Sequence, residues 1–200
     1  MTKVIANMSM SLDGFIADPQ DGVEHIFGWF GNGDVETPTA DGRFTFRTTE
    51  ASAARLRWAL TNIGAIVCGR RLFDLTDGWA GQHNMGAPVW VVTHRVPTDW
   101  VQAHPDAPFT FVTDGLAGAV EQAKAAAGPD KFVAVASASI AAQCLDAGLL
   151  DEVHVDLVPV LLGAGIPFFA NLTSAPVALA NPAVIEGDGV THLAYPVRPS

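Results

Sequence analysis

Short, continuously apolar runs alternate along this chain with segments whose apolar residues recur every three or four positions. A continuous apolar run suits a strand that is buried on both faces, as strands are in a parallel sheet. Helical segments between such strands form crossover units, which place helices on both faces of the sheet. The expected strands are residues 4–10, 65–68, 88–93, 109–113, 132–136 and 153–160.

Helix signals fill the gaps between these strands. A first helix is expected over residues 49–62, because Thr48 or Thr49 can cap it and leucines follow at helical spacing. Glycines mark the expected ends of later helices. Gly128 follows a helix capped by Asp114, and Gly148 follows one capped by Ser137 or Ser139. A short helix is also expected to open at Gly69 and to run through Leu75.

The last part of the chain is expected to form a β-hairpin. Residues 183–186 and 190–197 read as strands, and Gly187-Asp188-Gly189 between them is typical of a tight turn. Residues 31–48 carry little periodicity, and no element is predicted there. The sequence therefore predicts one α/β domain over residues 1–200: a mostly parallel sheet with helices on both faces and a C-terminal antiparallel hairpin.

Composition limits the expected partners and compartment. The 11 basic and 21 acidic residues give a net charge of −10, so nothing electrostatic favours nucleic acid or an anionic membrane. The chain opens without the apolar stretch of a signal peptide, and no apolar run approaches the roughly 20 residues of a membrane span. Cys68 and Cys144 lie in apolar runs. We expect them to be buried free thiols, which fits a cytoplasmic protein.

Small and polar residues follow several of the expected strands. In an open parallel sheet, ligands bind at the carboxyl ends of the strands, where helix N-termini carry partial positive charge. Each segment alone also fits an ordinary turn or a solvated loop. Their common placement favours an anion-binding rim for two or more phosphates. The segments are residues 11–14, Gly69-Arg70-Arg71, Thr93-His94-Arg95, Ala136-Ser137-Ala138-Ser139 and residues 162–165.

A competing group of polar residues lies on one expected strand. Glu152, His154 and Asp156 alternate with aliphatic residues, so all three point to one face. Such side chains are potential metal ligands. Side chains two apart on one strand are separated by about 7 Å, however, so three of them rarely converge on one ion. We therefore expect no metal. The P-loop, the Gly-x-Gly-x-x-Gly fingerprint and the Gly-x-Ser-x-Gly elbow are also missing from the sequence.

Three segments together point to a known superfamily. Residues 8–17 read Met-Ser-Met-Ser-Leu-Asp-Gly-Phe-Ile-Ala, residues 67–73 contain Gly-Arg-Arg, and residues 148–169 include Pro-Val-Leu-Leu-Gly. In this order they resemble the dihydrofolate reductase-like superfamily. The chain is most similar to the reductase domain of bifunctional riboflavin biosynthesis proteins and to its stand-alone relatives. The resemblance implies a three-layer fold around a sheet of about eight strands.

The resemblance also implies an NADPH-dependent reductase, usually a homodimer. Ile16 and Ala17 would border the nicotinamide, and Asp13 would be the acidic group nearest the hydride. The other implied cofactor contacts are Gly69 and Arg70 on phosphate, Thr93, His94 and Arg95 on the adenosine 2′-phosphate, and Ala136, Ser137, Ala138 and Ser139 on the pyrophosphate.

Two departures from the family pattern bear on function. The family usually has adjacent glycines after the fifth strand, whereas this chain has Ala136-Ser137. Their β-carbons leave less room for a pyrophosphate, although the Ser137 hydroxyl can compensate. The first long helix carries no acid beyond Glu50, so folate reduction is not expected. The zinc motifs of the deaminase half of the bifunctional proteins are missing as well.

The sequence thus favours an NADPH-dependent reductase of a small carbonyl or imine substrate, similar to 5-amino-6-(5-phosphoribosylamino)uracil reductase. Asp13, expected to be partly desolvated and neutral, would supply the proton. Trp29, Trp79 and His83 would line the substrate cleft. The alternatives are a non-catalytic binding module on the same fold, motivated by Ala136-Ser137, and a metal-dependent hydrolase using residues 152–156.

Overall fold

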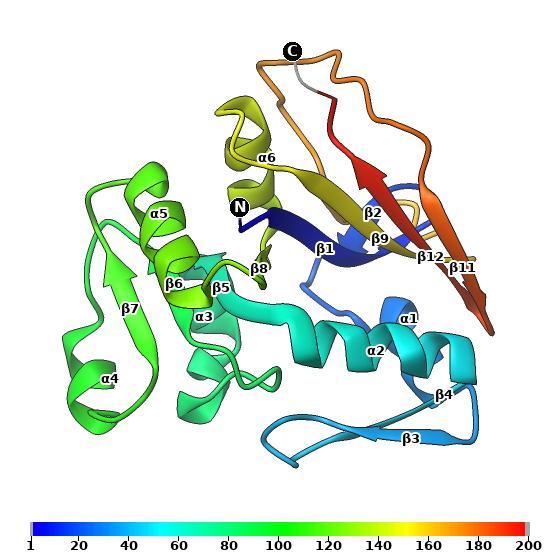
Figure 1. Ribbon diagram of the computed structural model, residues 1–200, viewed down its shortest axis with the longest axis horizontal. Helices are drawn as coiled ribbons and strands as arrows, with labels where there is room; N and C mark the ends of the chain where they lie inside the picture. Colours follow the sequence, from blue (N-terminus) through cyan, green and yellow to red (C-terminus); the bar gives the residue numbers. More distant parts are fainter. Residues whose placement is uncertain (1, 199–200) are drawn as a thin grey trace.

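An eight-stranded sheet runs through the middle of the molecule (Figure 1), in a computed structural model that describes residues 2–198. Its strand order is β11-β12-β9-β1-β8-β5-β6-β7. The strands from β9 to β7 are parallel, whereas β12 is antiparallel to both β9 and β11. The predicted fold class is confirmed. The strands are β1 (Val4–Ser11), β5 (Ile63–Gly69), β6 (Val89–Val92), β7 (Phe109–Val112), β8 (Phe132–Val135), β9 (Glu152–Val158), β11 (Ala183–Gly187) and β12 (Val190–Pro196).

Helices cover both faces of this sheet (Figure 1). α5 (Leu116–Ala127) and α6 (Ala138–Asp146) pack on one face, where Val120 and Ile140 join the core formed by Val4, Ala6 and Val133. α2 (Glu50–Asn62) and α3 (Arg70–Leu75) pack on the other face. The shorter helices are α1 (Glu24–Phe27), α4 (Thr98–Ala103), η1 (Gly28–Gly31) and η2 (Asp77–Gly81).

The helix ends mostly follow the expected signals. Thr49 caps α2, and its hydroxyl accepts from the N–H of Ser52. The prediction for Asp114 is wrong, because α5 begins at Leu116 after Gly115, which has a φ of 114°. This backbone conformation suits glycine, so the turn replaces a side-chain cap. Ser137 is at the N-cap position of α6, but its hydroxyl accepts from the N–H of Gly69 and does not cap the helix.

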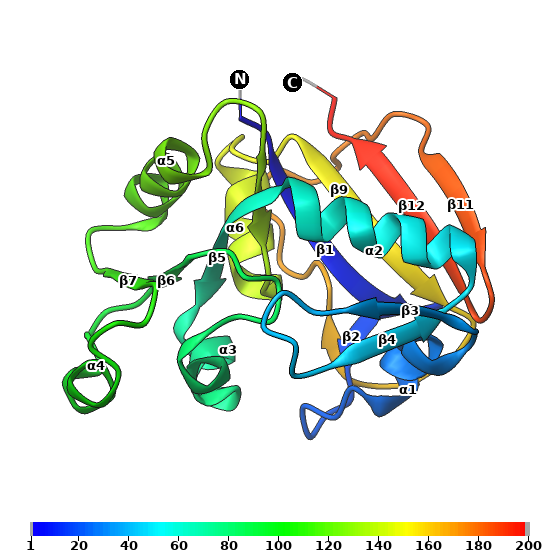
Figure 2. The ribbon, with the colours of Figure 1, turned by 60° about the horizontal axis from the view of Figure 1, so that its bottom comes forward.

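Residues 31–48 form a hairpin that the sequence did not predict. β3 (Val35–Pro38) pairs with β4 (Thr45–Thr48), and the hairpin packs beside α2 (Figures 1 and 2). Arg43 in its turn donates to the carbonyls of Trp79 and Gln82. Contacts with distant segments therefore order a stretch that lacks a periodic pattern of its own. A second small pairing joins β2 (Phe15–Ala17) to β10 (Ile166–Pro167).

The two cysteines are buried free thiols, as predicted. Cys68 lies in the core on the α3 side of the sheet, and Cys144 lies in the core on the α6 side. Burial raises the pKa of each thiol to about 12. In the part of the chain that the structure describes, no helix has the length and apolar character needed to cross a membrane.

The β3–β4 turn generates a prediction on acid stability. A hydrogen bond from Thr39, together with Arg43 and against some desolvation, lowers the pKa of Asp41 from 3.8 to about 2. The folded state thus favours the carboxylate, so its contribution is present above the unfolded pKa and is lost as pH falls toward 2. We expect Asp41→Asn to lower the free energy of unfolding by clearly more at pH 6 than at pH 2, as measured by urea unfolding. An equal effect at both pH values contradicts this.

Candidate active site at the carboxyl edge of the sheet

The parallel topology brings the predicted rim residues to one edge of the sheet. β1, β5, β6 and β8 run in the same direction, so the segments after them leave from the same side. Asp13, Gly69-Arg70, Thr93-His94-Arg95 and Ala136-Ser137 are these segments. All four segments therefore lie at the carboxyl edge of the sheet, although their side chains make different contacts there.

A cavity of about 420 Å³ lies beside Arg70 and Arg95, between α3, α4 and the loop after β6. Arg70 Nε pairs with Asp74 at 2.7 Å, and Arg70 Nη1 donates to the carbonyl of Arg95 at 2.8 Å. Among the described residues, no hydrogen bond or ion pair engages the Arg95 side chain. Carboxylates and the aromatic ring of Trp100 also line the cavity, with the buried Phe73 behind them. The remaining lining residues are Asp77, Val96, Pro97, Thr98 and Asp99.

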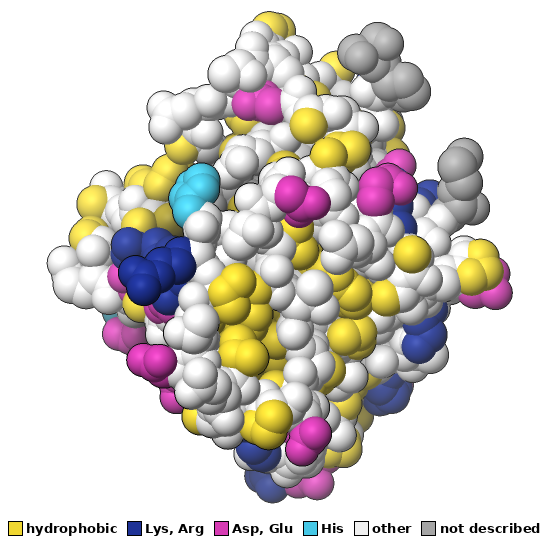
Figure 3. All heavy atoms as spheres, turned by 90° about the vertical axis from the view of Figure 1, so that its left-hand side faces the viewer, with side chains coloured by type: hydrophobic (Ala, Val, Ile, Leu, Met, Phe, Trp, Pro, Cys, Tyr) yellow, Lys and Arg dark blue, Asp and Glu magenta, His cyan; other side chains and the backbone are white. Residues whose placement is uncertain are grey.

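Basic side chains gather beside exposed apolar side chains at this end of the molecule (Figure 3), where β7, α4 and α5 form the surface. The arrangement provides a cation next to aromatic surface, which suits an anionic group attached to a planar ring. The carboxylates in the same cavity limit how much negative charge it accepts. The site thus fits a single phosphate better than a cluster of them.

The rest of the segment after β6 shapes the turn rather than lining this cavity. Thr93 is buried, and its hydroxyl accepts from the N–H of Arg95 and donates to the Arg95 carbonyl. His94 is exposed. Arg71, the second arginine after β5, forms an ion pair with Asp21 at 2.6 Å. Of the predicted cations, Arg95 is therefore the one best placed to meet a ligand.

A hydrogen bond links the turns that follow β5 and β8. The N–H of Gly69 donates to Ser137 Oγ at 3.0 Å. A β-carbon at Gly69 would lie 3.3 Å from Ile140 Cγ1 and 3.4 Å from Ser137 Oγ, so the two turns pack closely. Ser137 thus fastens the turn that opens α3, and it engages the Gly69 N–H that an anion would otherwise use.

Asp13 differs from its expected state. It is exposed; Ser11 Oγ donates to its carboxylate at 2.6 Å, and the N–H groups of Leu162 and Gly163 donate at 3.1 and 2.7 Å. The hydrogen bond from Ser11 lowers the pKa of Asp13 below its ordinary value, desolvation opposes this shift, and the N–H groups of Gly163 and Leu162 add to it. The expectation of a desolvated, neutral carboxyl is therefore wrong.

The three predicted cleft residues are not brought together. Trp29 is 3% exposed, and its Nε1–H donates to Ser9 at 3.1 Å, so it belongs to the interior. Trp79 and His83 contact each other at 4.5 Å between ring centroids. Burial lowers the pKa of His83 to about 4. A single cleft lined by all three residues is a wrong prediction, because their local segments pack on separate parts of the sheet.

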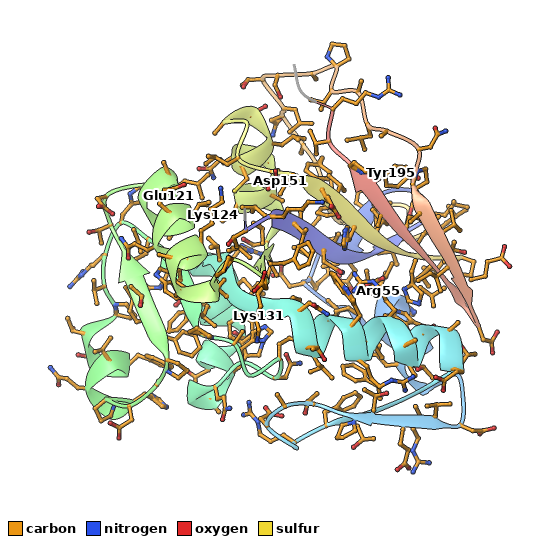
Figure 4. The ribbon with its side chains drawn as sticks, viewed as in Figure 1. Arg55, Glu121, Lys124, Lys131, Asp151 and Tyr195 are labelled. Atoms are coloured by element: carbon orange, nitrogen blue, oxygen red, sulfur yellow. The ribbon has the colours of Figure 1, made fainter. Side chains whose placement is uncertain are left out.

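A buried polar cluster beneath α2 was not predicted. It consists of side chains from β1, β9 and β12 that face Ser52 and Arg55 of α2, which points to the sheet (Figure 4). Glu152, His154 and Asp156 share one face, as expected; His154 bonds to Glu152, which also accepts from Lys3, and Asp156 bonds to His192 and Asn7. The alternating polar residues of β1 and β9 were the signal available in the sequence. We call Asn7, Ser52, Arg55, Glu152, His154, Asp156 and His192 the α2 polar cluster.

The sequence pattern of the RibD C-terminal domain matches residues 2–180. The chain belongs to the RibD C-terminal domain family. Its fold is shared with a protein from Shewanella sp. PV-4 that is provisionally assigned to riboflavin biosynthesis, with a TM-score of 0.70 and 19% identity over 98% of this chain and 99% of that one. No curated protein sequence matches the chain.

A second solved structure is the diaminohydroxyphosphoribosylaminopyrimidine deaminase/5-amino-6-(5-phosphoribosylamino)uracil reductase of Thermotoga maritima. It is 14% identical, with a TM-score of 0.56 over 98% of this chain and 57% of that one. The present chain thus spans little more than half of that larger protein. At these identities both likenesses concern the fold.

The loop at residues 162–165, which also contacts Asp13, is held against β2 by close backbone contact. Ile16 and Ala17 lie on β2, which pairs with β10. A β-carbon at Gly165 would lie 2.1 Å from the carbonyl oxygen of Ala17. Only glycine permits this approach. The segment from Leu162 to Gly165 is therefore fixed to both β2 and Asp13.

The Gly69–Ser137 link gives a prediction for this RibD C-terminal domain. Gly69 is buried, so Ser137→Ala leaves its N–H unpaired, and we expect a loss of about 1–3 kcal/mol in the free energy of unfolding. Ser137→Thr, which keeps the hydroxyl, is the matched control and should lose less. Urea unfolding measures both. If the two variants are equally stable, the link does not hold the turns together.

Proposed function

We propose that the chain is a reductase that transfers hydride from NADPH to a small carbonyl or imine substrate, similar to 5-amino-6-(5-phosphoribosylamino)uracil reductase. Membership of the RibD C-terminal domain family supports a reductase-like role. The observation that carries the proposal is the Arg95 side chain, which pairs with none of residues 2–198, in a cavity at the carboxyl edge of the sheet. We also propose that the protein works in the cytoplasm as a homodimer.

The residues at this edge fit the cofactor in part. Arg95 would hold the 2′-phosphate, and the ring of Trp100 in the same cavity suits an adenine. The turn at Gly69 and Ser137 would face the pyrophosphate. When bound, the nicotinamide supplies the hydride, whereas the protein supplies orientation and a proton. Ile16 and Ala17 would lie next to the nicotinamide.

One observation favours a second candidate function, a binding module that does not use the cofactor. The Gly69 N–H, which would suit a pyrophosphate oxygen, donates to Ser137. Asp74, Asp77 and Asp99 lie in the same cavity as Arg95 and oppose an anion. Such a protein would keep the fold and bind a small molecule without turnover. Cofactor binding separates the two candidates.

The cofactor test uses the fluorescence of the nicotinamide. We expect NADPH to bind more tightly than NADH by about 1–3 kcal/mol, the value of one or two hydrogen bonds to a charged group. Arg95→Gln should reduce the affinity for NADPH to that for NADH. Arg71 pairs with Asp21 instead of facing the cavity, so Arg71→Gln serves as the control. Equal affinities for the two cofactors in the unmodified protein contradict the assignment. Failure of both to bind favours the binding module.

The structure changes the expectation for Asp13. An ionised carboxylate that accepts from Ser11, Leu162 and Gly163 holds no proton at neutral pH, so we propose that it positions the loop at residues 162–165. Turnover in Asp13→Asn, measured as NADPH oxidation on a panel of carbonyl and pyrimidine substrates, should stay within about tenfold of the unmodified protein. Hydrogen exchange at Leu162 and Gly163 should rise. A loss of about 10²–10⁴-fold with unchanged exchange would restore Asp13 as a general acid.

A further inference from the structure

A second cavity of about 360 Å³ lies beneath the middle of α2, away from the carboxyl edge of the sheet. The polar part of its floor consists of Arg55, Glu152, His154 and His192 of the α2 polar cluster, and its other walls are apolar. A pocket with this combination, apolar walls and a few converging polar groups, is the usual form of a small-molecule site. The lining residues are Ala54, Arg55, Trp58, Glu152, His154, Ala183, Ile185, His192, Leu193 and Ala194.

The acceptor atoms of this floor are already engaged. Glu152 accepts from Lys3 at 2.6 Å through one oxygen and from His154 at 2.8 Å through the other. Asp156 likewise bonds to His192 at 2.7 Å and to Asn7 at 3.0 Å. Each of these four carboxylate oxygens thus already accepts one hydrogen bond from a protein donor.

The histidines are engaged at both ring nitrogens. Arg55 donates to His154 Nδ1 at 3.1 Å, so the other nitrogen of His154 carries the proton and donates to Glu152. Burial lowers the pKa of His154, which agrees with a neutral ring beside a guanidinium. His192 bonds to Asp156 through Nδ1 and to Ser52 through Nε2 at 2.9 Å.

Arg55 has charged donor groups that no described residue engages. Its Nη2 donates to Asn7 and His154, and its guanidinium lies over the ring of Trp58, 4.7 Å from the centroid. Within residues 2–198 no hydrogen bond engages its Nε or Nη1. Thr37 Oγ1 is the one buried polar side-chain atom without a partner in that range, so the free nitrogens of Arg55 reach the cavity surface.

We propose that this cavity binds a small organic monocarboxylate, which accepts hydrogen bonds from Arg55 and lays its apolar body between Trp58 and Ile185. A charge-assisted bond to a guanidinium favours a carboxylate over a neutral acceptor. The formal charges of Arg55 and Lys3 balance those of Glu152 and Asp156. A phosphate dianion would add two negative charges beside two carboxylates, which opposes its binding.

The test uses benzoate as the probe and the NMR signal of the Trp58 indole N–H as the readout. Because Arg55 also holds Asn7 and His154, its substitution threatens the fold. The test variants are therefore on β11, where neighbouring side chains point to opposite faces. Ile185 lines the cavity and is 40% exposed, whereas Val184 is 53% exposed and faces the other side. Ile185→Glu places a negative charge at the cavity, and Val184→Glu is the matched control.

We expect benzoate to shift the Trp58 signal with one-site saturation, and benzyl alcohol and inorganic phosphate to leave it unmoved at the same concentrations. Ile185→Glu should raise the Kd for benzoate about tenfold or more, and Val184→Glu should change it by less than about twofold. The proposal is overturned if no shift occurs up to about 20 mM benzoate. It is also overturned if benzyl alcohol binds as tightly, or if the two variants weaken binding equally. None of these outcomes bears on the reductase assignment.

Discussion

The polar face of β1 is the constraint around which the rest of the structure is arranged. Asn7, Ser9 and Ser11 alternate with Met8 and Met10, so a central strand presents hydroxyl and amide groups toward α2 and apolar groups toward α6. Buried polar groups need hydrogen-bond partners. Each of the three recruits a different part of the chain: Asn7 binds Arg55 and Asp156, Ser9 binds Trp29, and Ser11 binds Asp13 and the N–H of Phe15.

This constraint explains which parts of the fold follow from local sequence. The parallel strands and main helices are predictable because apolar runs, a threonine cap and terminal glycines act within a few residues. The β3–β4 hairpin is not, since Arg43 secures it through carbonyls some forty positions away. The burial of Trp29 is also not predictable from local sequence, because the indole N–H donates to Ser9, which lies on another element.

The same reasoning applies to the candidate site. Topology alone collects Gly69, Arg95 and Ser137 at one edge, and this much is readable from strand order. The pKa of Asp13 is lowered mainly by the neighbouring Ser11 hydroxyl, but its carboxylate also accepts from N–H groups of a loop about 150 residues further along the chain, a contact that no spacing reveals. Likewise, Arg55 sits on a helix whose sequence suggests ordinary packing, and its role emerges only when β9 and β12 are placed beneath it.

The placement of the two thiols allows thiol labelling to report local unfolding of each helical layer separately. Cys68 and Cys144 lie in separate cores on opposite faces of the sheet, and each is fully buried. A thiol reagent can reach one only when α3 and its neighbours separate from the sheet, and the other only when α6 does. The order in which they are labelled under native conditions would therefore tell which helical layer detaches first and whether the two layers open as a single cooperative unit.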